Sequence, residues 1–230
     1  MSTSNILLGS SNITLRTGLI SWWDFNGNLN DSHGSNTLGT VLNSATTSYI
    51  AGLNNQAFYI DGSSTSSSQV SYLDLASPVG FSGSQPFTFG GWFKIIGTTG
   101  TQGIFNMSEF PLQTTVPVSG TSPVTLTVNA SFTPTLSASI DLSTWRLIVY
   151  KYAPGVGGTL YYPATNTIVT GTSSFGSAGN QFSFGIARGN NAVRTGDTAI
   201  DSSFVWQRLL SDSEITQLYN GGAGLTYADT

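Results

Sequence analysis

Hydrophobic and polar residues alternate clearly near the end of the chain, over Ala199–Gly222. Ile200, Phe204 and Trp206 fall on one face of an extended strand there, with polar residues between them. We expect this strand to pair near the N-terminal strand and to complete a sheet.

A short helix is predicted directly after this strand. Ser211 is a favourable N-cap residue, and Glu214 stands three positions later, which makes a capping box. The next apolar residues recur at helical spacing: Ile215, Leu218 and Tyr219. Gly221–Gly222 then end the helix. Glu214 therefore has a structural role in this interpretation.

The rest of the chain is patterned as short strands separated by Gly, Asn and Ser turns. In Phe87–Ile96, bulky residues occupy both faces, which predicts a central strand covered on both sides. Trp145–Tyr152 and Phe182–Ala187 also alternate. Further strands are predicted at Gly18–Phe25, Asn54–Asp61, Gln69–Leu75, Gln102–Met107, Val124–Val128 and Thr159–Tyr162. About ten short strands with one helix indicate an all-β antiparallel sandwich.

Composition narrows the classes of function. Only 8% of the 230 residues are charged and the net charge is −4, so no basic stripe is available for nucleic acid. Cysteine is absent, which excludes disulfides and thiol chemistry. No apolar run approaches the ~20 residues of a membrane span. The first residues lack a basic segment followed by an apolar run, so we expect no secretory signal.

Residues Met1–Thr17 are polar, with two short apolar patches, one at Ile6–Leu8 and one formed by Ile13 and Leu15. One interpretation is a disordered tail, since chain ends are often poorly ordered. The other is an arm that docks on another subunit or on a second copy of the chain. We place the start of the folded domain at Gly18, and the docking-arm interpretation predicts that deleting Met1–Thr17 leaves the fold intact but abolishes the docking.

The chain resembles the laminin G-like branch of the concanavalin A-like jelly rolls. The segments that carry the resemblance occur in the family's order and cover about Gly18–Gly222: GLISWWDFNGNLNDSHG, AFYIDG, VSYLDL, FTFGGWFK, GIF, WRLIVY and AIDSSFVWQRLLSDSEITQLYNGG. The resemblance implies two curved antiparallel sheets forming one domain over residues 18–230. The chain departs from the family pattern in the turn after Thr159–Tyr162 and in the region Phe110–Pro134, which matches the family poorly. It does not fix a function, because this fold hosts many.

The inventory of acids and bases argues against an enzyme. Glycoside hydrolases need two carboxylates that flank the bond, but the chain has only two glutamates, Glu109 and Glu214. The single histidine, His33, lies in an Asp-Ser-His-Gly turn with no nucleophile elbow anywhere in the chain. One histidine without cysteine also excludes an ordinary zinc site.

Calcium is the one metal for which the sequence offers ligands, because it takes oxygens from carboxylates and carbonyls. The resemblance implies a calcium near an edge of the sandwich, and Asp31, Asp61 and Asp201 lie in the segments that match the family's acidic positions. If the first and last strands are neighbours, Asp31 and Asp201 could approach each other. The alternative is that these carboxylates cap turns and accept backbone N–H bonds.

Aromatic residues offer a second kind of site, in which rings stack on sugars. The five tryptophans lie in predicted strands, where core packing is the default. Tyr152, Tyr161 and Tyr162 lie near a Gly-rich turn and are the candidates for exposed stacking. Arg188 and Arg194 lie in a polar Gly/Asn loop, where they could bond a ligand or a neighbouring subunit.

Two non-enzymatic functions follow from these observations. The first is a virion surface protein of a tailed phage, in a head decoration, tail or fibre, joined to other subunits through Met1–Thr17 and contacting glycans of the host surface. A virion protein leaves the cell by lysis and needs no export signal. The alternative is a free extracellular lectin that binds glycans. A glycoside hydrolase is the least supported.

Overall fold

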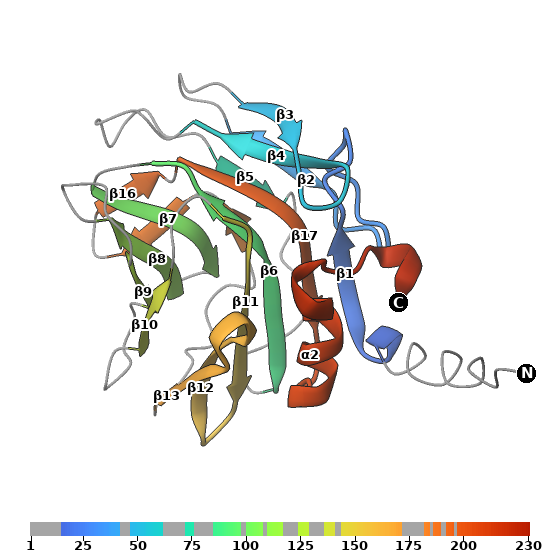
Figure 1. The fold of residues 1–230 in the computed structure, drawn as a ribbon, viewed down its shortest axis with the longest axis vertical. Coiled ribbons are helices and arrows are strands. Elements are labelled where there is room, and N and C mark those ends of the chain that lie inside the picture. Colours follow the sequence, from blue (N-terminus) through green and yellow to red (C-terminus); the bar gives the residue numbers. More distant parts are fainter. Residues whose placement is uncertain are drawn as a thin grey trace, which may run out of the picture.

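The protein folds as two antiparallel β-sheets packed face to face, seen here in a computed structural model (Figure 1). The structure describes residues 15–41, 47–61, 72–75, 85–97, 100–107, 110–116, 124–128, 136–140, 144–171, 182–184, 186–189, 192–195 and 197–230. The all-β antiparallel sandwich with a short C-terminal helix, predicted from the sequence, is confirmed.

The larger sheet has the strand order β13-β12-β11-β6-β17-β4-β3, and β1 also pairs with β17. Its strands are β1 (Leu19–Trp23), β3 (Thr47–Ala51), β4 (Gln56–Ile60), β6 (Phe87–Ile95), β11 (Arg146–Ala153), β12 (Gly157–Tyr162), β13 (Thr167–Gly171) and β17 (Thr198–Trp206). The pairing of β1 with β17 confirms that the last strand closes the sheet beside the first.

The smaller sheet has the order β10-β9-β8-β7-β14-β5-β2. Its strands are β2 (Leu38–Val41), β5 (Tyr72–Leu75), β7 (Gly100–Met107), β8 (Phe110–Val116), β9 (Val124–Val128), β10 (Leu136–Ile140) and β14 (Phe182–Phe184). A hairpin is formed by β15 (Ile186–Gly189) and β16 (Ala192–Thr195). The single strand predicted over Phe182–Ala187 is wrong, because β14 pairs within the sheet while β15 pairs with β16.

Aromatic rings fill the space between the two sheets. The phenylalanines of β6 point toward the smaller sheet. The ring of Phe89 lies 4.0 Å from that of Phe105 on β7 and 5.8 Å from that of Phe184 on β14, measured between centroids. Rings in such contact supply most of the energy of a sandwich core. We call this the inner core.

The opposite face of the larger sheet carries a second core beneath the helix α2 (Asp212–Tyr219). Trp92 on β6 stacks on Tyr219 with a centroid distance of 5.9 Å. Ile215 and Leu218 of α2 are buried there. Figure 1 shows α2 lying along this face, in front of β17 and beside β1. The strand β6 is therefore covered on both sides, as predicted from its sequence, and we call this second cluster the outer core.

A β-bulge in β17 decides which residues face which core. The register between β17 and β6 shifts between Asp201 and Phe204, and Ser202 has a positive φ of 44°. Such a bulge adds one residue and turns the rest of the strand over. Ile200 therefore lies in the inner core, whereas Phe204 and Trp206 lie in the outer core. The expectation that these three residues share one face is wrong for this reason.

Two glycines of β6 admit the bulged strand. A Cβ atom at Gly90 would come within 2.7 Å of the Phe204 ring, and one at Gly91 would clash with the Ser203 hydroxyl. Close approach of an aromatic ring or backbone is what the Gly90–Gly91 pair predicts. The bulged part of β17 can therefore pack against β6 only because residues 90 and 91 lack side chains.

The predicted capping box of α2 is confirmed. The Ser211 side chain accepts a hydrogen bond from the Glu214 amide, and the Glu214 carboxylate accepts one from the Ser211 amide. Arg208 also donates to both Glu214 oxygens, at 2.6 and 3.0 Å. Burial raises the pKa of Glu214, but the hydrogen bonds from Arg208 and Ser211 outweigh it, and the pKa is lowered overall. Glu214 is thereby committed to holding the helix start.

The packed part of the chain begins earlier than the predicted boundary at Gly18. Leu15 is fully buried in the outer core, and its carbonyl accepts a hydrogen bond from the Trp206 indole at 2.6 Å. The Thr17 carbonyl accepts a bond from Arg208, also at 2.6 Å. Arg16 donates to the Tyr227 carbonyl near the chain end. Residues 15–17 are thus part of the domain, while residues 1–14 of the predicted arm lie outside the described part of the chain.

No helix in the described part of the chain is both long and apolar enough to cross a membrane.

Truncation tests this revised boundary. We expect the free energy of unfolding of a protein that begins at Gly18 to be about 3 kcal/mol lower than that of a protein that begins at Leu15, because the shorter protein lacks the buried leucine. Urea denaturation of the two truncated proteins measures the difference. Equal stabilities would show that the boundary at Gly18 was correct.

Candidate ligand-binding site

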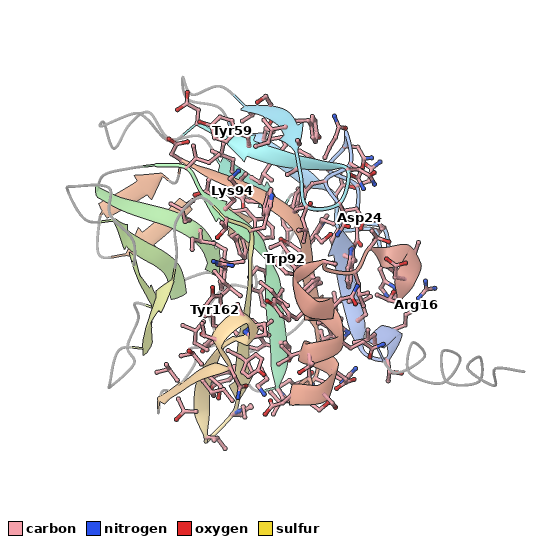
Figure 2. The ribbon with its side chains drawn as sticks, viewed as in Figure 1. Arg16, Asp24, Tyr59, Trp92, Lys94 and Tyr162 are labelled. Atoms are coloured by element: carbon pink, nitrogen blue, oxygen red, sulfur yellow. The ribbon has the colours of Figure 1, made fainter. Side chains whose placement is uncertain are left out.

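Beyond the end of α2, the outer face of the larger sheet carries polar and aromatic side chains instead of core. Phe58 and Ile60 of β4 lie in the inner core, so Tyr59 between them faces outward. The register places Tyr59 opposite Ala199 of β17, and Ala199 opposite Lys94 of β6. Three neighbouring strands therefore align these residues in one row, and Figure 2 labels Tyr59 and Lys94 at this end of the sheet.

A second row of the same face lies next to the first and carries carboxylates. Asp61 follows Tyr59 by two residues and Asp197 precedes Ala199 by two, so both belong to the outward side. The Tyr59 hydroxyl donates to Asp197 Oδ1 at 2.6 Å. The Asp197 carbonyl accepts from the amides of Ile96 and Gly97, which fixes its backbone beside the end of β6.

Burial and charge shift the pKa values of this pair in a consistent direction. Burial is the main cause that raises the pKa of Tyr59, and the neighbouring Asp197 adds to it. Burial also raises the pKa of Asp197; the Tyr59 hydrogen bond opposes this shift and the charge of Asp61 reinforces it. Tyr59 thus stays a neutral donor, and the carboxylates add acceptors beside it.

The buried carboxylate of Asp201 serves the fold. Its Oδ2 accepts hydrogen bonds from the amides of Leu53 and Asn54, at 2.7 and 2.9 Å, in the turn between β3 and β4. The Ser202 hydroxyl donates to Oδ1 at 3.2 Å. Burial raises the pKa of Asp201 to about 6, although these three bonds pull it down. Asp201 therefore ties the β3–β4 turn to the bulge of β17.

Asp31 also serves a turn. Its Oδ1 accepts hydrogen bonds from the amides of Trp22, His33 and Gly34, each at 2.9–3.0 Å. Its Oδ2 accepts a bond from the Asn36 amide at 3.1 Å. These contacts fit the interpretation that the carboxylate caps its own loop.

The three predicted calcium ligands thus have different surroundings: Asp31 caps a loop, Asp201 anchors a turn and Asp61 adjoins Asp197. Within the described residues there is no group of three or more His, Cys, Asp or Glu residues that could hold a metal ion. Calcium binding by Asp31, Asp61 and Asp201 stays a prediction.

The predicted exposure of Tyr152, Tyr161 and Tyr162 is wrong. All three are at most 4% exposed. Tyr152 and Tyr162 lie in the inner core, because β11 and β12 turn these positions toward the smaller sheet. Tyr161 lies in the outer core, and its hydroxyl donates a hydrogen bond to Asn166 Oδ1 at 3.1 Å. None of the three rings is placed to stack on a sugar from solvent.

Arg188 and Arg194 belong to the β15–β16 hairpin, where Arg188 pairs with Val193 and Arg194 with Ala187. They occupy adjacent positions in the ladder and are not a cross-strand pair. Their side chains lie outside the described part of the structure, so their predicted ligand contacts stay a prediction.

His33 shows none of the contacts of a catalytic triad within the described residues. Its Nδ1 lies 3.1 Å from the Tyr227 hydroxyl. The neighbouring Ser32 hydroxyl donates directly to Asp24, without an imidazole between them. Glu109, the second glutamate, lies outside the described residues.

The Tyr59 row was not identified from the sequence, although a signal for it exists. In the strand Gln56–Ile60, Ala57, Phe58 and Ile60 are buried, and the aromatic Tyr59 stands on the opposite face from Phe58 and Ile60. An outward aromatic next to Asp61 marks the position. That Lys94 and Asp197 join it depends on strand order, which the pattern of single strands does not give.

No protein-family model matches the chain, and no curated protein matches it by sequence. Solved structures share its fold. A botulinum neurotoxin type C structure, reported for cell entry through two ganglioside molecules, aligns with a TM-score of 0.64 at 12% identity, over 91% of this chain and 52% of that one. The binding domain of botulinum neurotoxin DC in complex with rat synaptotagmin II gives 0.61 at 11% identity, over 89% and 52%. This chain thus spans about half the length of these toxin chains.

A third similar structure is matched over nearly its whole length. Domain 4 of AbnA, an extracellular GH43 arabinanase from Geobacillus stearothermophilus, in complex with arabinotriose, aligns with a TM-score of 0.61 at 18% identity. The alignment covers 86% of this chain and 97% of that domain. The chain therefore shares a jelly-roll fold with these domains.

The role of Asp201 gives a pH-dependent prediction. Because its pKa is higher in the folded state, folding gains stability from protonated Asp201, and stability falls as pH rises from about 4 to about 6. Asp201→Asn keeps an oxygen for the two amides and can donate to Ser202. We expect this variant to lack that pH dependence and to exceed the wild type by up to about 3 kcal/mol at pH 7. Denaturant unfolding at pH 4 and pH 7 measures this.

Asp201→Ala is the matched control, because it leaves the Leu53 and Asn54 amides without an acceptor and should cost about 2–5 kcal/mol. If Asp201→Asn is destabilised as much as Asp201→Ala, and a chelator lowers the melting temperature of the wild type, the carboxylate holds a metal instead of a turn.

Proposed function

We propose that this chain is a non-catalytic carbohydrate-binding module. The observation that carries the proposal is the match over almost the whole length of an arabinanase domain that was solved with arabinotriose. The alignment covers 97% of that domain, so the fold of the arabinotriose-bound domain is matched nearly from end to end. The toxin matches add a ganglioside-dependent protein of the same fold, over half of its chain.

The composition supports a neutral, hydroxylated partner. Charged residues make up 8% of the chain, so Ser, Thr, Asn and Gln supply most of the polar groups. Such side chains both donate and accept hydrogen bonds, as sugar hydroxyls do. Few charged side chains are available to form ion pairs with a strongly charged ligand.

The positions of the carboxylates favour binding over hydrolysis. Hydrolysis of a glycosidic bond needs an acid and a base or nucleophile on either side of that bond. Glu214 is engaged by Arg208 and Ser211, and Asp31 and Asp201 by backbone amides. Asp61 and Asp197 adjoin each other on one face of the sheet, and Asp197 is bonded to Tyr59. Product analysis therefore accompanies the binding experiment that tests this proposal.

The interpretation as a virion surface protein of a tailed phage finds no support in the comparisons. It stays a prediction, as do the locations that go with it, the virion surface or the extracellular space. Of the arm that was expected to join other subunits, Leu15–Thr17 are engaged within the domain itself. The lectin alternative is the one that the similar structures favour.

A glycan array followed by calorimetry tests the proposal. We expect binding of arabinotriose or another neutral oligosaccharide with a dissociation constant between about 10 µM and 1 mM, since a small ligand on an open surface makes few contacts. The oligosaccharide should be recovered intact after prolonged incubation. Absence of binding to every glycan at millimolar concentration would refute the proposal, and shortened products would show an enzyme.

A further inference from the structure

We propose that the binding subsite is the outward patch at the end of the larger sheet, formed by Tyr59, Asp61, Lys94, Trp145 and Asp197, and that its ligand is a neutral oligosaccharide. We call these five residues the Tyr59 patch. This inference rests on the proposed carbohydrate-binding function and adds to it a place and a ligand class.

The strand register gives the patch its length. Tyr59, Ala199 and Lys94 are aligned across β4, β17 and β6. Arg146 pairs with Phe93, so the same antiparallel register, extended by one residue, sets Trp145 beside Lys94. Three steps between strands separate Tyr59 from Trp145, which is about 14 Å. The patch therefore presents an aromatic residue at each end of an elongated surface.

The patch is held in place before any ligand arrives. The hydrogen bond from Tyr59 to Asp197 fixes the ring at one end. Trp145 is half-buried against the outer core at the other end. Between Tyr59 and Lys94 the row carries Ala199, whose small side chain is fully buried, so the surface of the row is formed by the larger side chains on either side of it. Ordered side chains lose less conformational entropy on binding, so a weak ligand benefits from this arrangement.

The chemistry of the patch suits a sugar. Aromatic rings offer apolar faces to the C–H side of a sugar ring, while polar groups at their edges fix its orientation. The carboxylates of Asp61 and Asp197 accept hydrogen bonds from hydroxyl groups, and the Lys94 ammonium donates them. Hydrogen bonds to charged groups are roughly twice as strong as neutral ones. The rows of acceptors and of rings lie side by side, as a sugar chain with hydroxyls along one edge requires.

The charge of the patch selects against acidic sugars. Two carboxylates and one ammonium give it a net charge of −1, in a chain whose net charge is −4. A sialylated or uronic ligand would place its carboxylate near Asp61 and Asp197, and like charges repel. We therefore expect neutral oligosaccharides to bind more tightly than sialylated ones.

A second aromatic and charged cluster, around Tyr227, provides the comparison. The Arg16 guanidinium lies 4.5 Å from the Tyr227 ring centroid, and Arg16 also donates to the Tyr227 carbonyl. The Tyr227 hydroxyl lies within hydrogen-bond distance of His33. These contacts join the beginning and end of the described chain, so this cluster has a structural role and serves as the control surface.

Variants of the full chain test the assignment. Calorimetric titrations with arabinotriose, and with the best neutral glycan from the array, are made on the wild type, Tyr59→Ala, Lys94→Met and Tyr227→Ala. We expect about tenfold or greater loss of affinity for Tyr59→Ala and Lys94→Met, because each removes a main contact. Tyr227→Ala should keep the wild-type affinity. Lys94→Met keeps an aliphatic side chain of similar length, so it tests the ammonium without opening the surface.

The outcomes separate this inference from the proposed function. If the wild type binds a neutral glycan and both patch variants bind it equally well, the subsite is wrong and the function stands. If a sialylated glycan binds more tightly than neutral ones, the ligand class is wrong. If the wild type binds no glycan, the proposed function fails and the subsite with it.

Discussion

The bulge in β17 is the feature on which the rest of the structure depends. The bulge inserts one residue at Ser202. Along one edge, β17 pairs with β4 before the bulge and with β1 after it. Along its other edge, β17 pairs with β6 on both sides of the bulge. The residues before the bulge complete the inner core, and those after it build the surface on which α2 packs. A regular strand would send Phe204 and Trp206 into the space already occupied by the rings between the sheets.

The same bulge links the core to the proposed site. Asp201, at its start, holds the turn between β3 and β4 through the amides of Leu53 and Asn54. That turn leads directly into β4, which carries Tyr59. The burial of a carboxylate is unfavourable unless its oxygens are bonded, and here three donors satisfy it. The fold therefore accepts a raised pKa at Asp201 in return for a fixed position of the strand that presents the patch.

Sequence patterns gave the elements whose information is local. The capping box at Ser211 and Glu214 and the two-sided burial around Phe89 and Trp92 depend only on neighbouring residues, and both were predicted. The common face of Ile200 and Phe204 was not, because a bulge depends on the fit to Gly90–Gly91 of another strand. The prediction that Tyr152 is exposed was wrong for a similar reason. Alternation assigns a residue to one face of its strand, but it does not show whether another sheet covers that face. The Tyr59 patch joins residues in or next to four strands that are far apart in sequence, so only the order of those strands in the sheet could show it.

The central claim is that a neutral sugar binds on the outer face of the larger sheet, beyond the end of α2, where Figure 2 labels Tyr59 and Lys94. The most direct measurement is a nuclear magnetic resonance titration of the labelled full chain with a neutral oligosaccharide such as arabinotriose. The account predicts that the largest shifts occur at the Tyr59 ring, the Lys94 side chain and the Trp145 indole, while Tyr227 and His33 stay unchanged. Shifts centred on the Tyr227 cluster or on the smaller sheet, with the Tyr59 signals unmoved, would contradict it.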